Sequence, residues 1–420
     1  MKMGFAETDI TPQVSVEMVG FNRTENMSGG VLDCLTAQVS VWEDNGLSCL
    51  VTIDNIGFST KKANRLRDMI GTLICEPRER VMLSFSHTHA AMNTDVENEY
   101  YEMICRKICD AVKEAKASMK EVLVGWGNVD ATIGENRRKA SSKVDRRVGV
   151  LKVCSADNGK VKLIILRLKA HCNVLKADNY LISADYFGAV RKAFREKYCC
   201  PIMIVQGSAG NIAPKYYHAN YTPIDGQGEK FVNSVSALED MAQEVINQVE
   251  PMFQKIETKH NSNVDVYADY ISLESRVPNM SETQQIADEA LKYCGIDGRE
   301  WLGEVANLIN KGVSVQKDRV EIQYFCIGDW CLCGMPNETM TEFALETEKN
   351  LGNPYFFFNG YTNGCGSYFP TKEEYDLGGY EVYWAMLIYF SAYGRVYPYN
   401  RESFDIVTAF AVANYKKCRK

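Results

Sequence analysis

The chain has 420 residues, of which 46% are hydrophobic and 24% are charged, a composition typical of a folded globular enzyme with a large core. Its formal net charge of −7 argues against nucleic acid as a partner, because proteins that bind a phosphate backbone concentrate positive charge. No apolar run approaches the roughly 20 residues of a membrane-spanning helix. The N-terminal residues also lack the apolar core of a secretory signal, so we expect a cytoplasmic protein without a transmembrane segment.

The cysteine count is high and odd, at fifteen. In a long chain without an export signal, such cysteines are expected to be reduced thiols rather than a disulfide framework. The spacings in Cys331-Leu332-Cys333 and Cys199-Cys200 differ from the Cys-x-x-Cys of a structural zinc site. Most of the cysteines lie inside apolar runs, which predicts that they act as small buried hydrophobic residues.

Hydrophobic periodicity predicts alternating strands and helices along the chain. Residues 281–310 form a predicted helical pair that leaves the main body, and residues 255–263 a polar linker. The irregular alternation predicts an α/β protein of the mixed α+β kind, with residues 1–420 as one catalytic domain. Strands are predicted at 4–10, 35–42, 48–53, 81–90, 121–126, 148–153, 161–168, 201–206, 320–327, 330–335 and 354–358. Helices are predicted at 61–73, 97–120, 183–197, 231–249, 281–293, 299–310, 380–393 and 402–416, and another helix opens at Pro336-Asn337-Glu338 with Asn337 as its N-cap.

Two of the five histidines fall at the end of one predicted strand, in the stretch from Val81 to Ala90. Side chains at positions i and i+2 of a strand point to the same side, so His87 and His89 project together if the strand continues to Ala90. Two imidazoles in this place are suited to hold a metal or to transfer protons. The pair is also typical of polar residues where a strand meets solvent.

Three other features would converge with this pair if the strands that precede them lay side by side. His171 follows an apolar strand, Glu338 follows another, and tyrosines fill the Gly-rich loop at 359–375. Imidazole, carboxylate and phenol groups are able to bind zinc, which leaves one position for water in a catalytic site. Each feature has a simpler explanation: a buried structural histidine, an acidic residue favoured in a first helical turn, and an aromatic cover for the core.

Several motifs, in the same order along nearly the full chain, resemble those of the neutral (non-lysosomal) ceramidase family. They are Gly4-Phe5-Ala6-Glu7-Thr8-Asp9-Ile10-Thr11, Met18-Val19-Gly20-Phe21, Ser86-His87-Thr88-His89-Ala90, Asn136-Arg137-Arg138 against the family's Asn-Arg-Ser, Gly334-Met335-Pro336-Asn337-Glu338-Thr339, and Asn363 to Tyr375 with Tyr380-Glu381. The last resembles Asn-x-Tyr-x-x-Tyr-x-x-Thr-x-Glu-Glu-Tyr and is the most specific. The resemblance implies a neutral-ceramidase-like catalytic domain, with mixed sheets covered by helices. As a departure from the family, whose larger members carry a signal peptide and a C-terminal immunoglobulin-like domain, we expect neither in this chain.

The resemblance also implies an activity and its residues. A zinc ion (Zn²⁺) would be held by His87, His171, Glu338 and Tyr368, and a linear N-acyl amide, of a lipid or of a small molecule, would be hydrolysed by metal-activated water. His89, Arg137 and Tyr380 would surround the substrate carbonyl: His89 to transfer a proton, and Arg137 and Tyr380 to donate hydrogen bonds to the oxyanion.

A second departure from the family, in a loop, also bears on the substrate. The family's loop Gly-Asp-Val-Ser-Pro contains a serine important to ceramide hydrolysis, whereas this chain has Gly210-Asn211-Ile212-Ala213-Pro214. Ala213 has no hydroxyl, so the contacts of that serine are lost. Two further hypotheses therefore stay open: a zinc hydrolase of a small polar amide or ester, and a non-catalytic binding relative of the family. The sequence does not indicate an oligomeric state.

Overall fold

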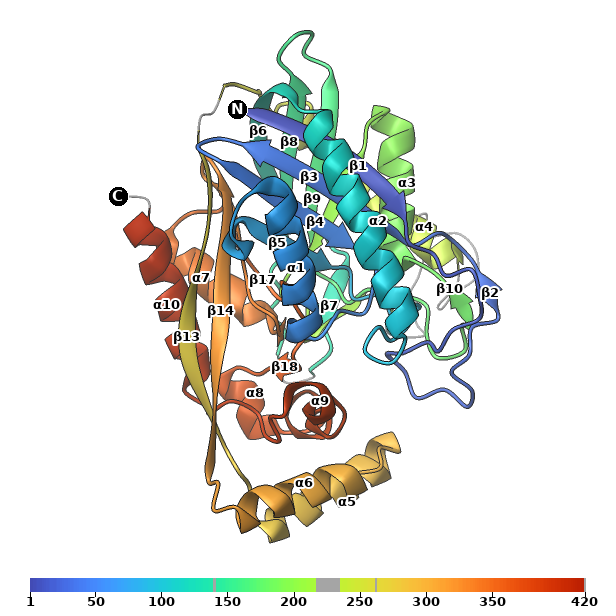
Figure 1. Ribbon diagram of the computed structural model, residues 1–420, viewed down its shortest axis with the longest axis vertical. Coiled ribbons are helices and arrows are strands. Elements are labelled where there is room, and N and C mark those ends of the chain that lie inside the picture. The colour runs from blue at the N-terminus through green and yellow to red at the C-terminus, as the bar shows by residue number, and fades with distance from the viewer. Residues whose placement is uncertain (139–140, 217–234, 261–262, 419–420) are drawn as a thin grey trace.

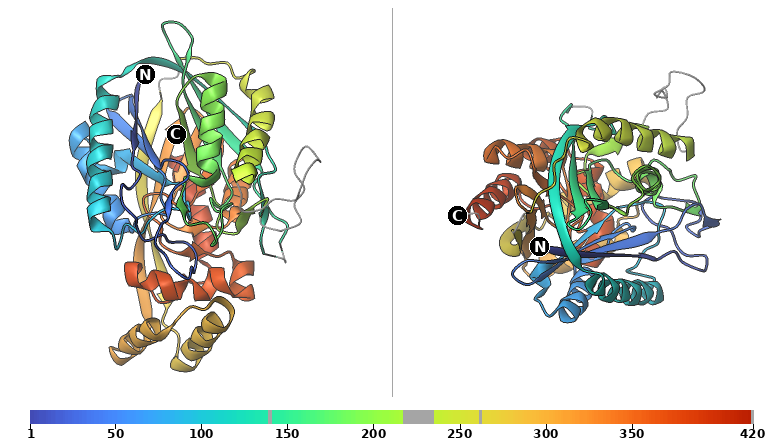
Figure 2. Two further views of the ribbon diagram at one scale, coloured as in Figure 1. Left: turned by 90° about the vertical axis from the view of Figure 1, so that its right-hand side faces the viewer. Right: turned by 90° about the horizontal axis from the view of Figure 1, so that it is seen from above.

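The computed structural model describes residues 1–138, 141–216, 235–260 and 263–418. Within these ranges two β-sheets pack face to face, and helices cover their outer faces, which gives four layers in the order α-β-β-α (Figures 1 and 2). The mixed α+β class predicted from the sequence is confirmed. His218 and the first residues of the helix predicted at 231–249 lie outside the described residues. The assignment of the chain to one domain stays a prediction.

The larger sheet has eight strands in the order β11-β9-β8-β6-β1-β3-β4-β5. The pairs β11–β9 and β4–β5 are parallel, and the others are antiparallel. Each of these strands overlaps a strand predicted from apolar periodicity. The bounds are β1 Lys2–Asp9, β3 Thr36–Glu43, β4 Leu47–Ile53, β5 Val81–Phe85, β6 Lys120–Asp130, β8 Arg147–Ser155, β9 Val161–Leu168 and β11 Ile202–Gln206.

Four helices cover the outer face of this sheet in two pairs. Helices α1 (Thr60–Ile74) and α2 (Asn98–Ala117) pack on β1, β3, β4 and β5, and α3 (Asp185–Tyr198) and α4 (Val235–Phe253) pack on β8, β9 and β11. Each helix has an apolar stripe at i, i+3 and i+4 spacing, such as Ile104 and Ile108 of α2, which are fully buried. Burial of these stripes is the main source of their stability.

The smaller sheet has the order β13-β14-β15-β17 and is covered by α7 (Thr341–Leu351) and α10 (Ser403–Cys418). Large side chains such as Trp42 and Phe357 fill the space between the two sheets. Cys326 and Cys331 face each other across β14 and β15 and form a disulfide, so the prediction of reduced thiols is wrong for these two. The strands are β13 Val264–Arg276, β14 Val315–Ile327, β15 Trp330–Gly334 and β17 Phe356–Asn359.

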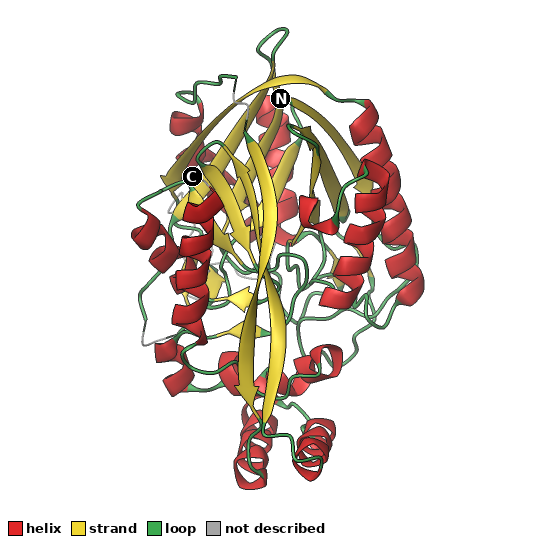
Figure 3. Cartoon of the chain, turned by 60° about the vertical axis from the view of Figure 1, so that its left-hand side comes forward, coloured by secondary structure: helices red, strands yellow, loops and turns green. Residues whose placement is uncertain are grey.

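The hairpin of β13 and β14 extends below the sheets and carries α5 (Met280–Cys294) and α6 (Arg299–Asn310) at its far end (Figure 3). These are the two helices predicted at 281–293 and 299–310. The Tyr293 ring of α5 stacks on Trp384, and the Trp384 indole donates to Glu289 Oε2 at 3.4 Å. Trp384 ends the π-helix η2 (Tyr380–Trp384), which precedes α9 (Met386–Tyr393). The hairpin end with α5 and α6 therefore packs against the segment that contains Tyr380.

Three local predictions differ from the structure, and one strand was missed. The strand predicted at 81–90 ends at Phe85; the helix after Pro336 begins only at Thr341; the helix predicted at 380–393 begins with a π-helix; and β13 was not predicted. Tertiary hydrogen bonds outweigh local preference at these points. The remaining short elements are β2 Gly30–Val31, β7 Gly134–Asn136, β10 Leu181–Ile182, β12 Ile212–Pro214, β16 Glu338–Thr339, β18 Tyr368–Phe369, α8 Lys372–Leu377 and η1 Arg78–Arg80.

Among the described residues, no helix combines the length and the apolar character needed to cross a bilayer.

Candidate metal centre and active site

The two edge strands of the larger sheet approach each other and bring the histidines together. The backbone N–H of Gln206, on β11, donates to Ser84 Oγ, on β5, at 3.3 Å. The Gln206 side-chain amide donates to the carbonyls of Ser86, at 3.1 Å, and of Ala170, at 2.9 Å. These carbonyls belong to the residues directly before His87 and His171. One buried glutamine thus joins the two chain segments that carry the imidazoles.

His87 points toward the other imidazoles because β5 ends before it, at Phe85, and not because the strand continues to Ala90. Its φ is 60°, a left-handed conformation that is uncommon for a residue with a side chain. Such backbone strain persists only where surrounding contacts enforce it, and it clusters at functional sites. The strand geometry assumed for His87 and His89 is therefore wrong, yet their ring centroids lie 4.9 Å apart.

The tautomers of His87 and His171 follow from their backbone partners. His87 Nδ1 lies 2.6 Å from the Ile56 carbonyl, and His171 Nδ1 lies 2.7 Å from the Ala209 carbonyl. A carbonyl only accepts, so each Nδ1 carries a proton, and in the neutral form of each ring the lone pair is on Nε2. This is the usual orientation of a metal-binding histidine.

The Glu338 carboxylate lies between these two Nε2 atoms. Oε2 is 3.2 Å from His87 Nε2 and 3.3 Å from His171 Nε2. The Tyr361 hydroxyl donates to Oε2 at 3.3 Å, and the Tyr389 hydroxyl donates to Oε1. Burial alone would raise the pKa of the fully buried Glu338, but the neighbouring His87 and His171 hold this pKa well below its usual value.

Glu338 is held by backbone contacts from two directions. It lies in β16, and its N–H donates to the Ser367 carbonyl at 2.9 Å. Gly210 passes so close that a Cβ atom there would lie 2.6 Å from the Glu338 carbonyl oxygen, which explains the glycine. The predicted N-terminal helical turn is absent at Glu338, so a helix dipole does not account for its position.

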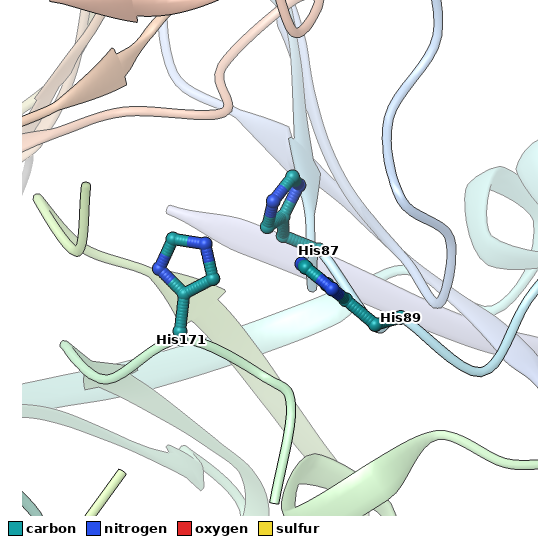
Figure 4. A group of neighbouring side chains, drawn as sticks. All are labelled: His87, His89 and His171. Atoms are coloured by element: carbon teal, nitrogen blue, oxygen red, sulfur yellow. The ribbon is translucent and has the colours of Figure 1, made fainter. Parts of the chain in front are cut away.

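His89 completes a group of three imidazoles that point toward one another (Figure 4). The candidate ligand atoms of His87, His89 and His171 all lie within 4.8 Å of one another. Both ring nitrogens of His89 are buried without a hydrogen-bond partner among the described residues. Buried polar atoms are normally satisfied, so an unbonded imidazole beside a buried carboxylate fits a site that takes a ligand.

Burial lowers the pKa of His89 well below its usual value, and the neighbouring His87 and His171 lower it further. For His171, burial and then the charge of Arg137 lower the pKa to about 4. Both imidazoles are therefore neutral near pH 7 and have lone pairs for a metal or a proton.

Arg137 and two tyrosines form the other side of the site. Arg137 Nη2 donates to the Gly210 carbonyl at 2.6 Å and to the Tyr368 hydroxyl at 3.1 Å. The Tyr368 ring stacks on His171, with an interplanar angle of 10° and centroids 6.3 Å apart, and it meets the Tyr380 ring edge-on at 5.8 Å. Burial, with the nearby negative charge of Glu338, raises the pKa of both phenols, so both are protonated near neutral pH.

The structure thus brings together all the residues that the sequence suggested for the site. The histidines and Glu338 meet directly, Tyr368 lies against His171, and Tyr380 reaches the group through Tyr368. Sequence reasoning missed Tyr361 and Tyr389, the two phenols on Glu338. Tyr361 lies in the aromatic loop and Tyr389 lies in α9, and neither local sequence marks which tyrosine faces inward. Ala213 lies buried in β12, beside the strand that leads to Arg137.

Two solved structures share this architecture. One is neutral ceramidase from Pseudomonas aeruginosa, which aligns with a TM-score of 0.76 and 17% identity over 99% of this chain and 74% of that one. The chain has the neutral ceramidase fold. A second structure, a ceramidase complexed with C2, aligns with a TM-score of 0.72 and 17% identity over 99% of this chain and 75% of the other. No protein-family model and no curated protein matches the sequence.

Proposed function

We propose that this neutral-ceramidase-like protein is a zinc-dependent hydrolase that cleaves a linear N-acyl amide bond. The observation that carries the proposal is the Glu338 carboxylate between two lone-pair-bearing Nε2 atoms, beside the unbonded ring of His89. The shared fold supports the same reaction class, because the two similar structures are ceramidases. The cytoplasmic location stays a prediction from the sequence.

The side chains of His87, His171, Glu338 and Tyr368 are the proposed zinc ligands. Nitrogen and oxygen donors of this kind suit zinc, and the carboxylate offsets part of the charge of the ion. When bound, zinc would polarise the substrate carbonyl and lower the pKa of an attacking water. The hydrogen bonds from His87 Nδ1 and His171 Nδ1 to backbone carbonyls keep both rings in the binding orientation.

Three residues of the chain have proposed roles toward the substrate. His89 is neutral and unbonded, so it is suited to take a proton from the attacking water and to deliver it to the leaving amine. Arg137 is always charged and offers a fixed fork of donors to the oxygen of the tetrahedral intermediate. The protonated Tyr380 phenol would donate to the same oxygen.

The acyl group is proposed to be a lipid chain, with a small polar amide or ester as the second candidate. Ala213 favours the second candidate, because it cannot supply the hydroxyl contact that the resembled loop makes. A site for a lipid should gain roughly 0.8 kcal/mol per buried CH₂, or about fourfold in kcat/KM.

The test is a series of N-acyl amines with acyl chains from two to sixteen carbons and one common amine. A steep rise of kcat/KM with chain length supports the lipid amide, and a flat or falling series favours the small polar substrate. Absence of turnover on every member, with zinc bound, would favour the non-catalytic relative. A matched ester series distinguishes amidase from esterase activity.

A further inference from the structure

A chain of alternating charges leads from Arg137 away from the imidazoles. Arg137 Nε lies 2.9 Å from Glu381 Oε1, and Arg138 Nη1 lies 2.8 Å from Glu381 Oε2. Arg138 Nε then lies 2.5 Å from Glu374 Oε2. The four side chains are at most 15% exposed, so solvent screens their interactions only weakly. One carboxylate, that of Glu381, is shared between two guanidinium groups.

Arg138 contacts the segment from α8 to the π-helix at several points. Besides its two ion pairs, its Nη2 donates to the Gly378 carbonyl at 2.7 Å. Gly379 has a φ of 86°, and a Cβ there would lie 3.3 Å from Arg138 Nη1, so the backbone wraps closely around the guanidinium. The resembled Asn-Arg-Ser motif has serine at this position. A serine side chain is too short to make these contacts. The contacts of Arg138 therefore distinguish this chain from the resembled motif.

The consequence for Arg137 is a fixed orientation of its guanidinium. Glu381 Oε1 forms an ion pair with Nε at 2.9 Å without hydrogen-bond geometry, while Gly210 and Tyr368 accept hydrogen bonds from Nη2. Among the contacts of the described residues, none engages Nη1, so this nitrogen is left for a ligand. Glu381 also directly follows Tyr380. The same carboxylate therefore anchors both groups that are proposed to face the substrate carbonyl.

We propose that Glu381 and Arg138 are positioning residues: Glu381 orients Arg137 and the start of the π-helix, and Arg138 holds Glu381 in place. The role rests on the proposed amidohydrolase function. Loss of the Glu381 charge lets the Arg137 fork rotate and Tyr380 shift, which weakens contacts to the carbonyl oxygen. Small displacements of such groups cost roughly 100-fold in rate. Zinc should stay bound, because among the described residues three of its four proposed ligands, His87, His171 and Glu338, have no hydrogen bond to Arg137.

The first test is Glu381→Gln, which keeps the shape of the side chain and removes its charge. We expect kcat/KM to fall about 10- to 100-fold, mainly through kcat, with an unchanged zinc content. The matched control is Glu373→Gln, an exposed carboxylate in the same helix as Glu374, which should leave both values unchanged. Should Glu381→Gln fail to fold, Arg138→Ser takes its place and should lower kcat in the same direction. A folded variant with kcat within twofold of the unaltered protein overturns the proposal.

A double-mutant cycle tests whether Glu381 acts through Arg137. In a protein that already carries Arg137→Met, Glu381→Gln should lower kcat/KM by several-fold less than in the unaltered protein, because only the effect through Tyr380 is left. An equal loss in both backgrounds would mean that Glu381 only supports the fold, and it contradicts the proposal.

A readout independent of turnover separates this proposal from the proposed function. The NMR signal of the Arg137 Nε–H group, assigned by its loss in Arg137→Lys, should be protected from solvent exchange in the unaltered protein and in Glu373→Gln. It should lose this protection in Glu381→Gln. If no N-acyl amine is hydrolysed, the proposed function fails, and the exchange result alone decides the orientation of Arg137. Unchanged protection in Glu381→Gln overturns the proposal.

Discussion

The two sides of the candidate site are built in different ways. On the imidazole side, His87, His89 and His171 follow strands of the large sheet, and buried carbonyls fix the rings of His87 and His171. On the arginine side, Arg137 directly follows the short strand β7, Tyr380 begins the short π-helix η2, and ion pairs through Glu381 connect the two segments. The first side therefore suits metal retention, and the second suits orientation of the substrate. The two functions should separate on mutation.

The largest effect is expected from Glu338→Gln, on the imidazole side. Removal of one partner from a buried charged pair costs about 3–5 kcal/mol, and a loss of the same size in zinc binding corresponds to roughly 150- to 5,000-fold weaker binding. Elemental analysis after dialysis should find little zinc and turnover should disappear with it. Glu346→Gln, on the covering helix α7, is the control. Full zinc occupancy in Glu338→Gln would rule out Glu338 as a ligand.

His89→Ala should separate chemistry from metal binding within the imidazole side. Loss of a general acid–base group lowers kcat by roughly 10²- to 10⁴-fold. Zinc content should remain that of the unaltered protein, measured on the same samples. Zinc loss comparable to that of His87→Ala would instead make His89 a third nitrogen ligand, as the close grouping of the three rings permits.

Arg137→Lys probes the arginine side with the charge retained. Lysine has no fork of donors, so we expect a loss of about 10²- to 10³-fold in kcat, the magnitude typical of an oxyanion donor. Zinc content should not change. Steady-state kinetics and elemental analysis together check this, and a rise in KM alone would mean that Arg137 binds substrate without stabilising the transition state.

The smallest effect concerns stability of the metal-free protein in acid. The pKa of His171 is lowered to about 4 in the folded protein from 6.5 in the unfolded chain, so the unfolded state binds the proton first as pH falls. Folding stability is therefore lost between these two values, by roughly 1.4 kcal/mol from pH 7.5 to 5.5. Urea unfolding at both pH values, with chelator present, measures it. His171→Leu should reduce this pH-dependent part, whereas the exposed His260→Leu should not.

The contrast between the imidazole side and the arginine side also explains which parts of the structure could be predicted from the sequence. Periodicity located β5, β9 and β11 because their side chains are buried on both faces of one sheet. It failed at Glu338, where parallel pairing with Tyr368 replaces the predicted helical turn. That pairing joins residues distant in sequence, so no local pattern indicates it. It failed equally for Tyr361, in a loop, and Tyr389, in α9, because only the tertiary fold brings them to Glu338.

The resemblance supplied what spacing could not. Residues such as Arg137 and Tyr380 have no local signal of their own, and only the ordered motifs suggested them. For Arg138 the structure supplied what the resemblance could not. The sequence shows that Arg138 departs from the resembled motif, but only its contacts with Glu374 and Glu381 explain the departure.

The most direct test of the central claim is hydrolysis of a panel of N-acyl amines by one protein preparation in three states: as purified, after chelation, and after chelation followed by one equivalent of zinc. The account predicts turnover in the first state, loss in the second and recovery in the third, with one zinc per chain. Undiminished turnover after complete zinc removal, or no turnover of any amide by the zinc-loaded protein, would contradict it.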